Sequence, residues 1–221
     1  IFFLEAIAYR THPQTKLILK LLRENIIGNV IKIKSEFGFD AGVPNINSRL
    51  FNKKLGGGSI RDLGCYPITF SNLIANYRQN EKEIIPKLRE VSGEIHELGI
   101  DLNAKAKLIY ENSISSDISV SINQRFKNET EIFGSKGTIK ILDPWLPKKK
   151  NIIEVKKDNK IEKIISNAEL EVFANQINFF NLSVQNKNLK ADYPAMSIDN
   201  SVNYMKVMTE WRDLVLKNES K

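Results

Sequence analysis

The stretch that decides the fold reads AKAKLIY at residues 104–110 and continues with ISVSI at residues 118–122. Apolar side chains occupy every second position in both segments, as in β-strands with one buried face. Weaker alternation extends over residues 84–166, which predicts several antiparallel strands instead of strands alternating with helices. Five polar residues would point away from the core: Lys105, Lys107, Ser119, Ser121 and Asn123. One face of the sheet is therefore expected to meet water or a polar partner.

Amphipathic helices are expected on both sides of this block. Apolar residues recur at helical spacing in residues 13–25 and 60–76, and again in residues 169–187 and 197–217. A strand with one slip in its alternation is expected at residues 30–39. Each of the last two helices has a single apolar stripe and should pack on something; the first stripe consists of Phe173, Ile177, Phe180 and Val184. The pattern predicts an α+β fold, an open-faced, mainly antiparallel sheet with helices on one face.

Composition favours an ordinary globular protein of one large domain, or one domain plus a piece of another. The 221 residues are 42% hydrophobic and 27% charged, and no apolar run is long enough to cross a bilayer. The net charge of +7 comes from scattered Lys and Arg, so neither a nucleic acid nor a membrane is expected as a partner. No group of residues has metal-ligand spacing. Cys65 is the only cysteine and cannot form an internal disulfide, which favours a reducing, cytoplasmic location.

The segment with most chemical information is LGGGSIRDLGCYP at residues 55–67. Three glycines allow a sharp turn and close approach to a ligand, and they lead into a helix N-terminus that favours anionic or hydroxyl groups. Asp62 and Tyr66 are four residues apart and share one helix face. A tyrosine has an ordinary pKa of about 10, so proton transfer near neutrality requires a nearby positive charge. A carboxylate and a phenol could then serve one substrate.

The same residues also permit a purely structural interpretation. Ser59 and Asp62 have the spacing of a capping box, so Asp62 could bond the helix N-terminus without any ligand. Tyr66 could likewise be a half-buried core aromatic. His12, which precedes Pro13 at a helix start, could be a solvated or capping residue.

Residues 55–67 resemble the GGG-x-x-x-D-x-G-x-Y/H motif of the Gfo/Idh/MocA family, which includes glucose-fructose oxidoreductases, inositol dehydrogenases and dimeric dihydrodiol dehydrogenases. Residues 5–13 (EAIAYRTHP) resemble the E-x-x-x-Y-R-x-x-P junction of that family, and residues 21–28 (LLRENIIG) resemble its I-R-E-N-x-x-G helix end. Residues 133–139 (FGSKGTI) resemble a turn in its open sheet. The resemblance spans most of the chain in the right order.

The resemblance implies a site. Tyr66 would be the acid/base residue, and Asp62 would orient substrate hydroxyls and assist proton transfer. Tyr instead of His at position 66 is more similar to the dihydrodiol dehydrogenase and glucose-fructose oxidoreductase branches. His12 would reach the nicotinamide side of the cleft. The substrate-binding residues implied by the family are Arg10, Arg49, Gly57 and Gly58.

The family also carries a nucleotide-binding Rossmann domain with a G-x-G-x-x-G turn and an E-K-P motif, and neither motif occurs in this sequence. NAD or NADP is therefore expected to bind mainly to a domain outside the chain, and the chain alone is expected to be inactive. Residues 1–10 are expected to be a remnant of the last Rossmann strand. Residues 11–221 would form the substrate-binding and oligomerisation domain.

The implied activity is hydride transfer between NAD(P) and a sugar, polyol or related hydroxy or keto compound, by a homo-oligomer assembled through the open sheet face. Two alternatives share the fold: a non-catalytic binding or assembly module, and an NAD-dependent glycosidase. The joint presence of Asp62, Gly64 and Tyr66 favours an enzyme over an assembly module, which needs none of them. Products would distinguish the glycosidase.

Overall fold

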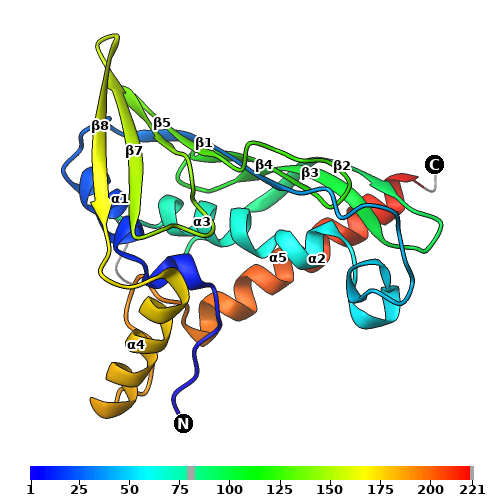
Figure 1. The fold of residues 1–221 in the computed structure, drawn as a ribbon. Coiled ribbons are helices and arrows are strands. Elements are labelled where there is room, and N and C mark those ends of the chain that lie inside the picture. The colour runs from blue at the N-terminus through cyan, green and yellow to red at the C-terminus, as the bar shows by residue number, and fades with distance from the viewer. Residues whose placement is uncertain (79–82, 220–221) are drawn as a thin grey trace.

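The computed structural model describes residues 1–78 and 83–219 and is built on one open sheet (Figure 1). The strand order is β2-β3-β4-β1-β5-β6-β7-β8, and every neighbouring pair is antiparallel except β1 and β4, which are parallel. The strands are β1 (Val30–Gly38), β2 (Lys87–Ile95), β3 (Asp101–Ile109), β4 (Ser115–Ser121), β5 (Thr130–Gly134), β6 (Gly137–Ile141), β7 (Lys150–Lys157) and β8 (Lys160–Asn167). The α+β prediction is confirmed.

The central strands have the predicted two-residue alternation. Ala104 on β3 pairs with Val120 on β4, and both are buried, whereas Lys105 is exposed on the other face beside half-buried Ser119. Ser121 differs from the prediction because it is fully buried, and its hydroxyl accepts hydrogen bonds from the backbone nitrogens of Asn123 (3.2 Å) and Gln124 (2.9 Å). The residues that follow the strand thus satisfy the Ser121 hydroxyl.

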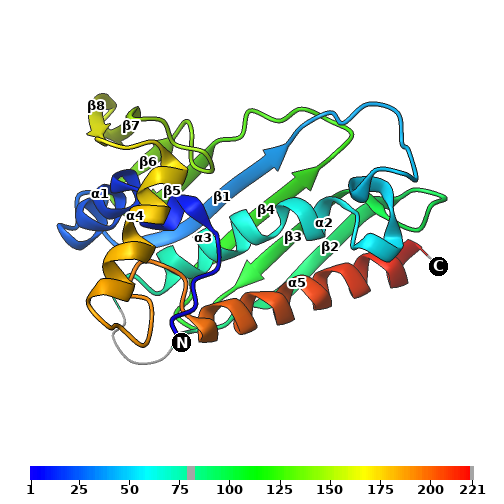
Figure 2. The same cartoon turned by 60° about the horizontal axis from the view of Figure 1, so that its bottom comes forward.

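Helices cover one face of the sheet. They are α1 (Pro13–Arg23), α2 (Ser59–Leu63), α3 (Cys65–Ala75), α4 (Val172–Gln185) and α5 (Ile198–Glu219). Three short 3₁₀ turns accompany them: η1 (Ala8–Thr11), η2 (Arg49–Phe51) and η3 (Lys53–Leu55). Figures 1 and 2 show α2, α3 and α5 lying along the same side of the strands. Trp211 on α5 and Ile74 on α3 are fully buried in the core, and each such side chain contributes about 1.5–3 kcal/mol by leaving water.

The helix predicted at residues 60–76 is two helices, interrupted at Gly64. Pro67 has no N–H to donate to the carbonyl of Leu63, so the hydrogen-bond ladder is broken at that point. Regular bonding resumes with the bond from Ile68 N to Gly64 O at 3.2 Å. Gly64 itself keeps helical backbone angles, with φ −61° and ψ −27°.

The apolar stripe of α4 is largely uncovered within the described part of the chain. Phe173 and Ile177 are 59% and 61% exposed, and α4 projects from the body of the molecule (Figure 1). At its inner side α4 contacts η1, and the ring of Phe180 lies 5.4 Å from that of Phe2. The prediction that this stripe packs on something is therefore not met by the residues described.

Residues 1–7 have no regular secondary structure and are followed by η1. A strand requires a neighbour for its backbone hydrogen bonds, and none of the eight described strands pairs with this segment. The assignment of residues 1–10 as a remnant of a Rossmann strand stays a prediction. Among the described helices, none combines the length and apolarity needed to span a bilayer.

Candidate functional site

The glycine turn leads from η3 into α2 and is packed against the protein itself. Gly58 has a φ of 114°, which L side chains rarely adopt, and a Cβ there would lie 2.4 Å from Oδ1 of Asp101. A Cβ on Gly57 would lie 2.5 Å from the carbonyl oxygen of Leu50. Gly57 and Gly58 are therefore required by close packing of the turn, and the space beside these two glycines is filled by protein atoms.

Asp101, at the start of β3, caps α2. Its Oδ2 accepts hydrogen bonds from the Ser59 hydroxyl (2.8 Å) and from the backbone nitrogen of Ile60 (2.6 Å). The capping-box interpretation is wrong, because Gly58 is the N-cap and its cap has no side-chain hydrogen bond. Burial raises the pKa of the Asp101 carboxyl, partly offset by these hydrogen bonds and by Arg212. Sequence reasoning missed Asp101 because the partner it caps is 41 residues away.

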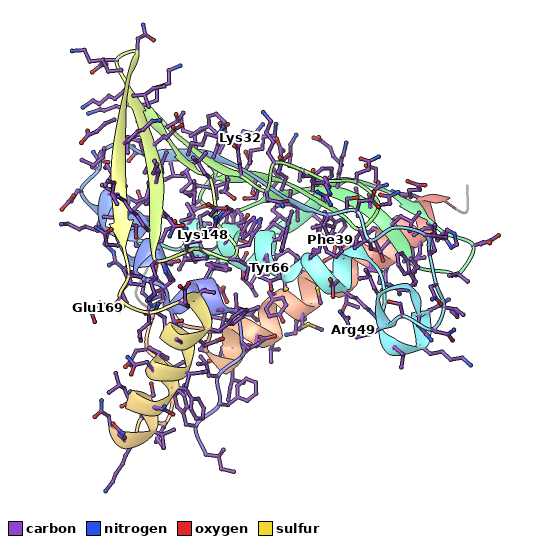
Figure 3. All side chains as sticks on the ribbon, in the orientation of Figure 1. Lys32, Phe39, Arg49, Tyr66, Lys148 and Glu169 are labelled. Atoms are coloured by element: carbon purple, nitrogen blue, oxygen red, sulfur yellow. The ribbon has the colours of Figure 1, made fainter. Side chains whose placement is uncertain are left out.

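Asp62 projects from α2 and forms an ion pair with Arg49 on η2. The Asp62 side chain is 20% exposed and that of Arg49 is 61% exposed. Figure 3 shows Arg49 on the loop next to α2, and the loop and the helix together bring these predicted site residues into contact. Apart from this pair with Arg49, the carboxylate of Asp62 has no hydrogen bond to the described residues.

Tyr66 lies in the first turn of α3, on the helix-covered side of the sheet (Figure 3). Its ring meets Phe37 edge-on at 5.0 Å and Trp145 edge-on at 6.1 Å, and the Trp145 indole donates to the carbonyl of Glu36 at 2.9 Å. Among the described residues, nothing hydrogen-bonds the Tyr66 hydroxyl. Burial, with smaller contributions from the charges of Cys65 and Asp62, raises the pKa of Tyr66 to about 12. The phenol is therefore a protonated donor at neutral pH.

A cavity of about 570 Å³ brings Asp62 and Tyr66 together. Its walls come from residues 5–7, from α2 and α3, and from α5. This volume is within the usual range for small-molecule sites. Residues that matter for its chemistry are Glu5, Arg61, Asp62, Tyr66, Tyr204 and Arg212.

Arg10 and His12 do not line this cavity. Arg10 is buried and donates from Nε to the carbonyl of Pro194 (2.5 Å) and from Nη1 to that of Thr69 (2.9 Å), so it joins a distant loop to α3. His12 is the N-cap of α1, where its Nδ1 accepts from the backbone nitrogen of Gln14 at 3.1 Å. The capping interpretation of His12 is confirmed, and burial lowers the pKa of its imidazole.

A family model described as the GFO/IDH/MocA C-terminal domain matches residues 15–140, more than half of the chain. The chain belongs to the Gfo/Idh/MocA family. Within this family, a trans-1,2-dihydrobenzene-1,2-diol dehydrogenase from Xenopus tropicalis is 33% identical over 149 residues, which are 66% of this chain and 42% of the relative. The mouse enzyme of the same name is 29% identical over 148 residues, or 66% of this chain and 41% of the relative. The match thus spans well under half the length of these relatives.

Solved structures show the same Gfo/Idh/MocA fold. KijD10, a 3-ketoreductase from Actinomadura kijaniata solved with NADP and TDP-benzene, superposes with a TM-score of 0.80 at 17% identity and covers 97% of this chain and 62% of that one. An aldose-aldose oxidoreductase from Caulobacter crescentus complexed with glycerol superposes with a TM-score of 0.78 at 16% identity, again over 97% and 62%. At this identity the likeness concerns the fold.

In the described part of the chain, no cluster of His, Cys, Asp and Glu could hold a metal ion.

Proposed function

We propose that this chain is the substrate-binding part of an NAD(P)-dependent oxidoreductase that transfers hydride to or from a sugar, polyol or related hydroxy or keto compound. The observation that carries the proposal is the shared cavity of Tyr66 and Asp62, in which the Tyr66 hydroxyl has no hydrogen bond to the described residues. A free phenol beside a carboxylate suits a reaction in which a substrate hydroxyl gains or loses a proton. The names of the dehydrogenase, ketoreductase and aldose-aldose oxidoreductase relatives support the same class.

We assign the proton-transfer step of the reaction to residues of this chain. Tyr66 would exchange a proton with the reacting oxygen, and Asp62, held by Arg49, would orient neighbouring substrate hydroxyls. The pKa of about 12 for Tyr66 means that the phenol alone is a poor base near neutrality. An added positive charge next to it would lower that pKa and make proton transfer in both directions accessible.

The nicotinamide end of the cofactor could supply the positive charge that Tyr66 needs. A bound NAD or NADP would supply the hydride chemistry, and its oxidised nicotinamide carries a positive charge that could act on Tyr66. The nucleotide part would be held by a domain outside the chain, since the sequence has no G-x-G-x-x-G turn. From this chain, His12 remains a proposed neighbour of the nicotinamide side, and Arg10, Gly57 and Gly58 would support the pocket through the packing described above.

The proposal includes a homo-oligomer formed through the open sheet face and a cytoplasmic location. The open face is polar and carries ion pairs within the chain, such as Lys32 with Asp117 at 2.5 Å and Lys140 with Glu129 at 2.7 Å. Figure 3 shows Lys32 on that face. A cytoplasmic location is supported by the single free Cys65. Light scattering of the full gene product would contradict the assembly if it gave a monomer mass at all concentrations.

The test of function is an assay of the full-length gene product with NAD and NADP against a panel of sugars and polyols. We expect turnover with at least one pair, and a loss of about 100-fold or more in kcat for Tyr66→Phe. Tyr77→Phe is a matched control, because Tyr77 is a buried tyrosine that does not line the cavity. A product that binds neither dinucleotide nor sugar would overturn the proposal in favour of an assembly module.

A further inference from the structure

The wall of the cavity that holds Tyr66 and Asp62 includes two side chains that each carry a polar atom without a hydrogen-bond partner. Oε2 of Glu5, on the N-terminal segment, and Nε of Arg212, on α5, are both buried and both lack a hydrogen-bond partner. A buried polar atom without a partner costs about 1–3 kcal/mol, and more when it is charged. Two such side chains on the wall of one cavity call for a shared explanation.

Each of these side chains has one polar neighbour within the protein. Oε1 of Glu5 accepts a hydrogen bond from the Tyr204 hydroxyl, which leaves Oε2 as the free acceptor. Nε of Arg212 lies 3.8 Å from Oδ1 of Asp101, which also lacks a hydrogen-bond partner. This distance permits charge attraction but exceeds a hydrogen bond. The Arg212 side chain is only 11% exposed. Both groups are therefore positioned without being satisfied.

The opposite polarity of the two groups indicates the chemistry of their partner. Glu5 can only accept a hydrogen bond when ionised, and Arg212 can only donate. A hydroxyl donates and accepts, so neighbouring hydroxyls on one molecule could satisfy both. A carboxylate or phosphate would suit Arg212 but would be repelled by Glu5 and Asp62. An apolar ligand would leave both groups unpaired.

We propose that Glu5 and Arg212 are specificity-determining residues that bind substrate hydroxyls across the cavity from Tyr66 and Asp62. This inference rests on the proposed function and adds two residues to its site. Glu5 accepts from one hydroxyl and Arg212 donates to another, so the site selects a polyhydroxylated substrate over an analogue that lacks either group. A site built to bind a hydroxyl rejects the deoxy analogue strongly, because its own polar groups are then left unpaired.

The competing explanation is that Arg212 serves only to neutralise Asp101. In that case removal of the Arg212 side chain would destabilise α2 and lower kcat equally for every substrate. The two explanations differ in selectivity: only a residue that touches the substrate changes the ratio of kcat/KM between a sugar and its deoxy analogue.

The experiment uses the full-length gene product with NADP and three probes, D-glucose, D-xylose and myo-inositol, each compared with its monodeoxy analogues. The variants are Glu5→Gln, Arg212→Met and Arg212→Lys, with Lys206→Met as the control. Lys206 is an exposed cation on the same helix that does not line this cavity. Arg212→Lys tests rescue by a residue that retains the charge and a donor.

For Arg212→Met and Glu5→Gln we expect KM for the accepted probe to rise roughly tenfold, and discrimination against at least one deoxy analogue to fall by a similar factor. Arg212→Lys should recover part of both effects, and Lys206→Met should change neither. Unchanged discrimination in an active Arg212→Met enzyme would overturn this inference and leave the proposed function standing. A wild-type protein inactive on all three probes with either dinucleotide would count against both.

Discussion

Oδ2 of Asp101, on β3, lies 2.6 Å from the backbone nitrogen of Ile60, in the first turn of α2. A strand thus caps the short helix that carries Asp62. Because α2 is only five residues long, its own hydrogen bonds cannot hold it, and its position depends on this tertiary cap. The geometry of the candidate site is consequently tied to a residue outside the glycine motif.

Replacing this cap should destabilise the domain. Asp101→Ala removes the oxygen Oδ2, which accepts the hydrogen bonds from both Ser59 and Ile60, and we expect a loss of about 1–3 kcal/mol in the free energy of unfolding. Asp101→Asn retains one acceptor oxygen and should cost less. Urea denaturation followed by circular dichroism measures both variants. Equal stability of Asp101→Ala and the wild type would contradict the role of the cap.

Asp101 should also give the protein a characteristic pH dependence. Burial raises the folded-state pKa of its carboxyl, whereas the unfolded chain titrates at about 4. Between these two pKa values the folded state binds more protons, so this group's contribution is complete below about pH 4 and is lost as pH rises through the folded pKa. We expect the Asp101→Asn variant to lack this decline. Denaturant midpoints measured across that pH range, wild type against variant, provide the comparison.

The glycine turn offers a matched pair of substitutions. Gly58 and Gly42 both have positive φ, 114° and 77°, but a Cβ on Gly58 would meet Asp101 at 2.4 Å, whereas a Cβ on Gly42 meets nothing within 4 Å. Gly42→Ala should cost about 1 kcal/mol from backbone strain alone. Gly58→Ala should cost clearly more, because it also displaces the α2 cap. Thermal melts of the two variants, run side by side, would disprove the packing role of Gly58 if the shifts in Tm matched.

The sequence predicted the local features well and the tertiary ones poorly. The alternation around Ala104 and Lys105 predicted the strands and the open face because its period depends only on neighbouring residues. The break at Gly64 could have been foreseen from Pro67, three residues later. The hydrogen bonds of Arg10 could not be predicted in this way, because its partners, the carbonyls of Thr69 and Pro194, lie 59 and 184 residues away. No local pattern encodes such contacts.

The same limit applies to the candidate site. Spacing alone placed Asp62 and Tyr66 together, and the shared cavity agrees with that prediction. Glu5 and Arg212 contribute to that cavity from opposite ends of the chain. Glu5 opens the E-x-x-x-Y-R-x-x-P junction, whereas no motif marks Arg212. Their place beside Asp62 and Tyr66, and their unsatisfied atoms, became visible only in the structure. Periodicity does not encode which distant residues meet in the fold, so this part of the site could not be predicted from the sequence.

The ion pair between Arg49 and Asp62 should matter for substrate binding more than for stability. Arg49 is 61% exposed, and exposed ion pairs contribute about 0–1 kcal/mol. Arg49→Gln should therefore leave the melting temperature nearly unchanged. In the full-length protein we expect it to raise KM several-fold, because Asp62 would no longer be held toward the cavity. Lys53→Gln, a change on the adjacent η3 turn, is the control, and an equal KM in both variants would contradict the positioning role.

The state of Tyr66 should depend on the dinucleotide. In the chain as described its pKa is raised to about 12, chiefly by burial. A positive nicotinamide ring beside the phenol stabilises the phenolate, so oxidised NADP should lower this pKa, by about 1–3 units for an adjacent charge. The measurement is a near-ultraviolet titration of tyrosinate in the full-length protein, taken as the difference between wild type and Tyr66→Phe with and without oxidised NADP. Reduced NADP is the matched control, because its nicotinamide is neutral and should leave the curve close to that of the free protein. Identical difference curves with both forms would mean that the nicotinamide does not lie beside Tyr66. The proposed role of Tyr66 in proton transfer would then have to be abandoned.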